Sequence, residues 1–289
     1  MTDDFLRDAV SRRTFLARMT AAGLGTAAAA LLAGCGGGGS SSGVTTPGTN
    51  GLTTFADQAN FPGIPGQNIN LVVLNYALTL ETLEADLYRQ ALNVAAGKDI
   101  NAPLPANNAA AYTLAVPTGG LDATQTKAGF AYLQQFAYVE TAHRDFLRTA
   151  IPTFGGTPVP ANAKGYSAAS AGLVPGADLK TILTVILTAE ETGVQAYLGS
   201  ASFLTVPALV EQASSIYSTE SRHSAVINLS LGIIDAGATG APGPSGRFGG
   251  VQPLTVPAGD TNVPILPGTG EFSKTPKQVL AAIQPFFVA

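Results

Sequence analysis

The sequence predicts an all-α fold, a four-helix bundle with long connections and an irregular C-terminal tail. Four segments repeat apolar residues at the spacing of one helix face, and each is long enough for a bundle helix. Stretches rich in Pro, Gly, Asn and Ala separate most of these segments. The first two segments also share a pattern of charged and aromatic side chains with the last two, as matching halves of one bundle would.

The first half of the predicted bundle consists of helices over residues 68–96 and 122–151. On the first helix, the stripe expected to face inward consists of Leu74, Ala77, Leu78, Glu81, Ala85 and Tyr88. The second helix has Asp122 as its expected N-cap, because an aspartate side chain can accept a hydrogen bond from the first turn. Its inward stripe consists of Leu133, Phe136, Ala137, Glu140, His143 and Leu147.

The second half consists of helices over residues 178–199 and 207–234. The stripe of the third helix consists of Leu179, Ile182, Ile186, Glu190, Gly193 and Tyr197. That of the fourth consists of Ala213, Ile216, Glu220, His223, Ile227 and Ile234. The connections over 97–121 and 152–177 are long, but the one between the third and fourth helices is short, so these two should be antiparallel neighbours.

Residues 237–289 form a predicted C-terminal extension that is mostly irregular. Gly and Pro are frequent in its first part, which predicts no regular element there. Residues 275–287 indicate one short helix, with Thr275 as its cap and Pro276 at its first position.

The composition limits the classes of partner. The chain has 289 residues, enough for one large domain or two small ones, and a formal net charge of −4. Lys and Arg form no cluster beyond the first twenty residues, so no nucleic-acid partner is expected. The single cysteine excludes a disulfide framework.

The N-terminal residues 1–35 resemble a twin-arginine export signal with a lipoprotein box. Arg12 and Arg13 precede an alanine-rich run that is too short for a good membrane-spanning helix and ends at Cys35. The resemblance implies a lipid on Cys35, a membrane anchor, and a location in the periplasm or cell envelope. An ordinary basic signal region with a chance cysteine is the alternative. Residues 36–67 should then form a flexible linker rich in Gly, Ser and Pro.

The two histidines of the chain occur in the same local arrangement. A glutamate precedes each by three residues: Glu140 before His143, and Glu220 before His223. Residues three apart in a helix point about 60° apart, so each pair can approach one site from a single turn. Salt-linked pairs on a solvated surface are the alternative, but both histidines fall on the apolar stripes.

Glutamates fall on all four stripes that should be buried. A carboxylate taken out of water without a partner is costly, and few basic residues lie on these stripes. Arg144 and Arg222 stand beside the histidines but point about 100° away around the helix. Two divalent cations would balance four glutamates and two neutral imidazoles, and ligation rich in oxygen with one nitrogen per metal suits iron or manganese.

One Glu from each of two helices with Glu-x-x-His from the other two is the pattern of di-iron and di-manganese carboxylate bundles. The chain therefore resembles the ferritin-like superfamily over residues 68–236. Its segment LNYALTLETLEADLY (74–88) is similar to the opening helix of the secreted group that includes desiccation-related proteins. The resemblance implies six metal ligands, which are Glu81, Glu140, His143, Glu190, Glu220 and His223.

Two neighbouring glutamates are alternative ligands, Glu84 and Glu191. Glu81 and Glu190 are preferred because each precedes a tyrosine, Tyr88 or Tyr197, by seven residues, which makes the two halves agree. Glu84 lies one turn from Glu81 and could replace a ligand or add to the set. The two tyrosines are expected only to pack near the site, as large aromatic residues on a helix stripe usually do.

The resemblance implies an exported protein that holds two divalent ions, iron or manganese, and carries out redox chemistry on dioxygen or peroxide. Ferroxidase, peroxidase and manganese-catalase activities all use this type of scaffold. One alternative is a non-catalytic cell-envelope protein of stress or desiccation protection with a structural or vestigial metal site. Another is metal storage, which would require a homo-oligomer.

Overall fold

A computed structural model of the protein describes residues 59–105, 112–233 and 274–288. The predicted signal segment 1–35, with Cys35, lies outside the described residues, as do most of the predicted linker and most of the C-terminal extension. The described part is built from helices, which confirms the predicted all-α fold class.

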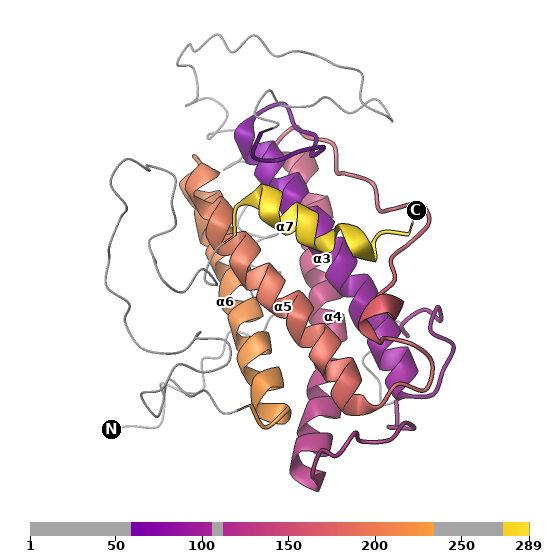
Figure 1. Ribbon diagram of the computed structural model, residues 1–289. Helices are drawn as coiled ribbons and strands as arrows, with labels where there is room; N and C mark the ends of the chain where they lie inside the picture. The colour runs from indigo at the N-terminus through magenta and orange to yellow at the C-terminus, as the bar shows by residue number, and fades with distance from the viewer. Residues whose placement is uncertain (1–58, 106–111, 234–273, 289) are drawn as a thin grey trace, which may run out of the picture.

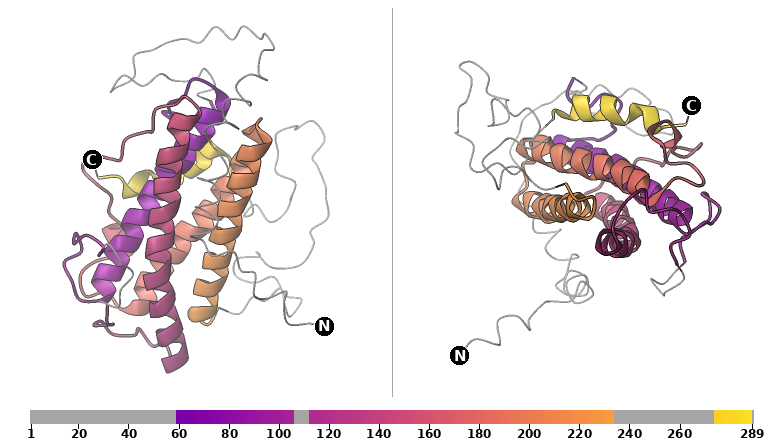
Figure 2. Two further views of the ribbon diagram at one scale, coloured as in Figure 1. Left: turned by 180° about the vertical axis from the view of Figure 1, so that it is seen from behind. Right: turned by 60° about the horizontal axis from the view of Figure 1, so that its bottom comes forward.

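Four long helices form the bundle. They are α3 (Ile69–Ala95), α4 (Ala123–Thr153), α5 (Leu179–Ser200) and α6 (Pro207–Ser230). Short 3-10 turns occupy Ala169–Ala171, Ala201–Phe203 and Gln284–Phe286. α3 packs along α4 and α5 along α6, while α3 also contacts α5 and α4 contacts α6 (Figure 1). The bundle therefore has two layers, α3 with α5 and α4 with α6, as the right-hand view of Figure 2 shows.

The starts of the helices follow from local sequence. Asp122 caps α4 as predicted, in a capping box with Gln125 that satisfies the backbone N–H groups of both residues. The side chain of Asp178 caps α5 in a similar way. α6 begins with Pro207, a residue suited to a first position because it has no N–H group to leave unpaired.

The fourth helix ends earlier than predicted. α6 stops at Ser230, and Gly232 has a positive φ of 70°. The N–H of Gly232 donates to the carbonyl of Leu229 at 3.0 Å, which closes the end of the helix. A glycine in the left-handed region is a common helix terminator. The predicted last residue, Ile234, lies outside the described residues.

α3 is buried on nearly all sides and not only along its predicted stripe. The connecting segments cover its other faces, and polar side chains of α3 hold them in place. Asn75, for example, donates from Nδ2 to the carbonyls of Pro65 and Thr157, at 3.0 and 3.1 Å. Phe61 is fully buried and meets Tyr76 edge to face, so the packed body begins before α3.

The short C-terminal helix α7 (Pro276–Ile283) packs against α5 on the outside of the bundle (Figures 1 and 2). It has the predicted cap, Thr275, and the predicted proline at its first position. Its own side chains Val279 and Ile283 are buried against the bundle. Burial of these side chains explains why α7 stays on the bundle.

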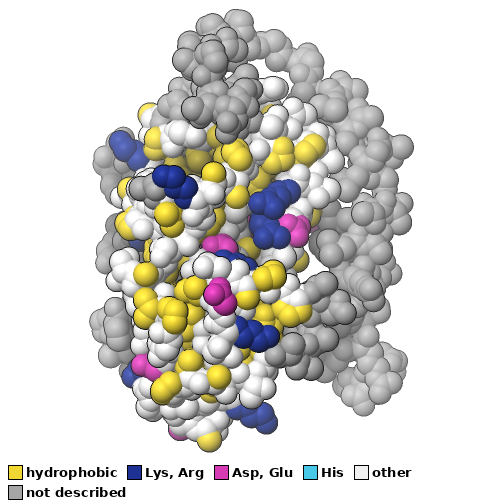
Figure 3. All heavy atoms as spheres, turned by 90° about the vertical axis from the view of Figure 1, so that its right-hand side faces the viewer, with side chains coloured by type: hydrophobic (Ala, Val, Ile, Leu, Met, Phe, Trp, Pro, Cys, Tyr) yellow, Lys and Arg dark blue, Asp and Glu magenta, His cyan; other side chains and the backbone are white. Residues whose placement is uncertain are grey.

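The outer surface is mixed in character. On the face drawn in Figure 3, basic and acidic side chains are interspersed among hydrophobic ones. Across the ranges described above, no helix is both long enough and apolar enough to cross a membrane.

We expect Ile283→Ala to lower the free energy of unfolding by about 2–4 kcal/mol, because it leaves a cavity under α7. Chemical denaturation followed by circular dichroism measures this change. The control is Val288→Ala, which truncates a side chain that is 39 % exposed and should change stability by less than about 0.5 kcal/mol. Equal stability of wild type and Ile283→Ala would show that α7 does not stabilise the bundle.

Candidate metal centre

Four helices bring the six predicted ligands to the middle of the bundle. Glu81 comes from α3, Glu190 from α5, and the two Glu-x-x-His pairs from α4 and α6. All four glutamates are 0 % exposed and His223 is 2 % exposed. The side chain of His143 is 14 % exposed, so the cluster comes closest to solvent at this residue.

The six residues form two overlapping groups that could each hold a metal ion. One group is Glu81, Glu140, His143 and Glu220; the other is Glu140, Glu190, Glu220 and His223. Within each group, one ligand atom from every residue lies within 4.8 Å of the others. Glu140 and Glu220 belong to both groups, which is the arrangement that carboxylates shared by two cations require.

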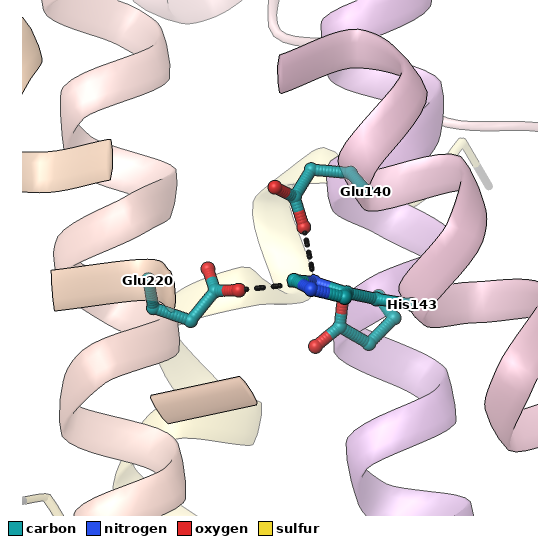
Figure 4. A group of neighbouring side chains, drawn as sticks. Glu140, His143 and Glu220 are labelled. Atoms are coloured by element: carbon teal, nitrogen blue, oxygen red, sulfur yellow. Dashed lines mark hydrogen bonds and ion pairs between the residues drawn. The ribbon is translucent and has the colours of Figure 1, made fainter. Parts of the chain in front are cut away.

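Glu140 lies between the two imidazoles. Its Oε2 is 2.9 Å from Nδ1 of His143, and its Oε1 is 2.8 Å from Nδ1 of His223. Nδ1 of His143 is also 3.2 Å from Oε1 of Glu220, the carboxylate that reaches across from α6 (Figure 4). Nδ1 of His223 is 3.3 Å from Oε1 of Glu190. Each histidine therefore presents the same ring nitrogen to the carboxylates.

Several buried atoms of this cluster form no hydrogen bond of good geometry among the described residues, although three of the carboxylate oxygens lie 2.8–3.4 Å from an imidazole nitrogen. They are Glu81 Oε2, Glu140 Oε1, Glu190 Oε2, both carboxylate oxygens of Glu220, and His223 Nδ1. Buried polar atoms without partners are rare and costly in proteins. Hard oxygen atoms and imidazole nitrogens that converge in this way fit a divalent cation such as iron or manganese.

The nearby arginines do not neutralise the carboxylates. Arg144 forms an ion pair with Asp145 at 2.8 Å, and Arg222 donates to the hydroxyls of Ser218 and Thr219. The structure thus confirms that these two guanidinium groups point away from the cluster. Because both guanidinium groups are bound elsewhere, a cation from solution is the simplest source of positive charge for the buried carboxylates.

The two tyrosines do more than pack near the site. Tyr88 on α3 donates to Glu190 on α5, and Tyr197 on α5 donates to Oε1 of Glu81 on α3 at 2.5 Å. Each tyrosine thereby holds the glutamate of the opposite half. The shared seven-residue spacing of glutamate and tyrosine is visible in the sequence. That each tyrosine bonds the glutamate of the other helix follows only from the packing of α3 against α5.

Phe136 supports one imidazole in a way that the sequence did not predict. Its ring stacks on His223 with centroids 3.7 Å apart and an interplanar angle of 24°. Tyr132 stacks in turn on Phe136 at 5.5 Å. This column fixes the ring plane of His223 and separates it from solvent.

The two alternative ligands lie outside both groups. Glu84 is buried, at 3 % exposure. Glu191 is only partly buried. The structure therefore places Glu81 and Glu190, the two glutamates that the tyrosine spacing favours, in the cluster, and their metal ligation stays a prediction.

Burial and mutual repulsion change the protonation of the cluster. Burial, with smaller effects from neighbouring charges, raises the pKa values of Glu81, Glu84, Glu190 and Glu220. Burial would also raise the pKa of Glu140, but the imidazoles of His143 and His223 outweigh it and lower this pKa to about 2. Burial opposes a charge on His143, yet Glu140 and Glu81 raise its pKa well above the ordinary value.

These shifts predict how the stability of the metal-free protein depends on pH. Four carboxyl groups and His143 bind protons more tightly in the folded protein than in the unfolded chain. The stability that this proton binding contributes is fully present below the ordinary pKa values of 4.5 and 6.5, and it is lost as pH rises through the raised pKa values of the folded protein. With chelator present, the free energy of unfolding should therefore be larger at about pH 5.5 than at about pH 8. Glu140 acts oppositely, but only between about 2 and 4.5.

Urea denaturation at the two pH values measures this difference. The metal-loaded protein is the control, because bound cations keep the carboxylates ionised and the imidazoles neutral and should remove the loss of stability at the higher pH. A chelated protein that is more stable at the higher pH would contradict the burial of unneutralised carboxylates.

Comparison with known proteins agrees with the fold. A search of curated proteins finds no match for this chain. A family model described as a ferritin-like domain matches residues 70–232, more than half of the chain. This range contains all six residues of the cluster. The chain therefore belongs to the ferritin-like domain family.

Proposed function

We propose that the protein is an exported di-metal carboxylate protein that carries out redox chemistry on dioxygen or peroxide. The observation that carries the proposal is the convergence of four carboxylates and two imidazoles inside an apolar bundle, without a Lys or Arg partner among the described residues. Two divalent ions would balance four carboxylates in formal charge. Iron or manganese fits the oxygen-rich donor set.

The six residues would include ligands shared by both metals and ligands of one metal only. Glu140 and Glu220, which belong to both groups, would be shared by the two ions. Glu81 with His143 would complete one position, and Glu190 with His223 the other. We give these roles to the same six residues that the family resemblance implied.

Two adjacent redox-active ions can together exchange the two electrons that reduction of an O–O bond requires. The protein itself would position the ligands and exclude water from the site. The hydroxyls of Tyr88 and Tyr197 hold Glu190 and Glu81 in place. Burial and these carboxylates raise the pKa values of both tyrosines well above 10.0, so each keeps its proton. Small oxidants would enter beside His143, the most exposed residue of the cluster.

We further propose that the mature protein is anchored by a lipid on Cys35 in the periplasm or cell envelope. The twin-arginine motif and the lipoprotein box support this, and export of a folded chain would allow metal loading beforehand. The similarity of residues 74–88 to secreted, desiccation-related proteins is consistent with it. A homo-oligomer is compatible with this location.

The double variant Glu140→Ala/His143→Ala tests the metal centre, because it removes a shared carboxylate and one imidazole. Wild type should contain two equivalents of iron or manganese by elemental analysis and should consume peroxide. The double variant should retain less than about a tenth of the metal affinity and lose the activity. The matched control is Arg144→Ala/Asp145→Ala on the same helix, which should behave as wild type.

A wild-type protein that folds stably and binds neither metal would contradict the proposal. It would favour the non-catalytic alternative.

The lipid anchor is tested with Cys35→Ser. In a bacterial host with twin-arginine export and lipoprotein processing, the wild-type protein should fractionate with membranes, and the variant should move to the soluble fraction. Immunoblots of the fractions and the mass of the mature N-terminus give the readout. Release of both proteins into the soluble fraction would rule out the anchor.

A further inference from the structure

The two halves of the metal centre differ at the position three residues after the glutamate of α3 and of α5. Glu81 and Tyr88 on α3 correspond to Glu190 and Tyr197 on α5, and each pair is linked to the other by a hydrogen bond. Three residues after the first glutamate, however, α3 has a glutamate and α5 has a glycine: Glu84 and Gly193. The halves are therefore matched in their ligands but not in this neighbouring pair.

Gly193 is required by space and not by backbone conformation. It lies within α5 and is absent from the glycines of positive φ. A Cβ atom at this position would be 2.9 Å from Oε1 of Glu84 and 3.1 Å from Oε2 of Glu220. Alanine is favoured over glycine inside a helix, so the glycine weakens α5 locally. The absence of a Cβ atom at Gly193 leaves space for the carboxylates of Glu84 and Glu220.

Glu84 is a buried carboxylate beside the cluster. Its side chain is 3 % exposed, and its Oε2 has no hydrogen-bond partner in the described part of the chain. Burial, followed by the charges of Glu220 and Glu81, raises its pKa well above the ordinary value. Glu220 and Glu81 are both members of the group that contains His143. Glu220 belongs to the other group as well, but Glu81, which is found only in the group with His143, lies one turn before Glu84 on α3.

We propose that Glu84 is a seventh metal-facing ligand, seated in the space that Gly193 leaves, and that it makes the two metal positions unequal. The position with His143 would have an additional carboxylate and would fill first. The position with His223 would have no such residue, because glycine stands at the equivalent place on α5. This inference rests on the proposed di-metal function.

Titration of the chelator-treated, full-length protein with Mn²⁺ by calorimetry tests it, with the absorption spectrum of Co²⁺ as a second readout. Wild type should bind two ions in two resolved steps. Glu84→Gln should weaken the tighter step by at least about tenfold and leave the weaker step unchanged. Gly193→Ala should also weaken the tighter step, because its methyl group meets the carboxylates of Glu84 and Glu220. Both variants should alter the Co²⁺ spectrum of the first ion.

The double variant Glu84→Ala/Gly193→Ala separates this role from simple packing. Because both single changes act on the carboxylate of Glu84, the loss of Mn²⁺ affinity in the double variant should be smaller than the sum of the two single losses, and the part that remains from the methyl group is its contact with Glu220. Glu191→Gln controls for the loss of a charge beside the cluster. Gly129→Ala controls for an added methyl group, which there would meet Leu183. Both controls should keep the wild-type affinities.

The outcomes distinguish this inference from the function on which it rests. Two ions bound with the same affinities in wild type and Glu84→Gln would overturn the role of Glu84 and leave the di-metal centre intact. Two Mn²⁺-binding steps of equal affinity in wild type would overturn the proposed difference between the two metal positions. A folded wild type that binds neither Mn²⁺ nor Co²⁺ would overturn the proposed function itself.

Discussion

Burial of negative charge is the constraint on which the rest of this structure depends. Five glutamates, each at most 3 % exposed, lie inside a bundle whose other inward residues are largely apolar: Glu81, Glu84, Glu140, Glu190 and Glu220. Desolvation and mutual repulsion both oppose their ionisation, and the nearby arginines bind elsewhere. In the absence of a cation, the repulsion within the cluster is relieved by proton uptake, by a charged His143 and by the hydrogen bonds of Tyr88 and Tyr197. Cation binding offsets the same repulsion and links metal loading to stability.

The bundle meets this constraint by joining its two halves at the site. The hydroxyls of Tyr88 and Tyr197 cross between α3 and α5, so each half holds a glutamate of the other. Glu140 and Glu220 face the same imidazole from α4 and α6. Because every long helix contributes a ligand candidate, displacement of any one would disturb the whole cluster. The connections packed around α3 and the C-terminal α7 keep these helices in register.

The sequence predicted those features that depend on periodicity and caps. Helical spacing placed the glutamates on inward stripes, and the structure brings the six candidates together. Other features depend on contacts between segments distant in sequence, which periodicity does not encode. The space at Gly193 depends on where Glu84 reaches from another helix, and the ring of Phe136 on the position of His223. The full burial of α3 likewise depends on where the connections settle.

Anomalous diffraction from crystals of the Mn²⁺- or Fe²⁺-loaded protein measures the central claim most directly. Data collected on either side of the metal absorption edge locate the ions independently of any assumed ligand. We predict two peaks in the middle of the bundle, one beside Nδ1 of His143 and one beside Nδ1 of His223, with Glu140 and Glu220 contacting both. A bundle with the same fold and no anomalous peak among these carboxylates would contradict the account.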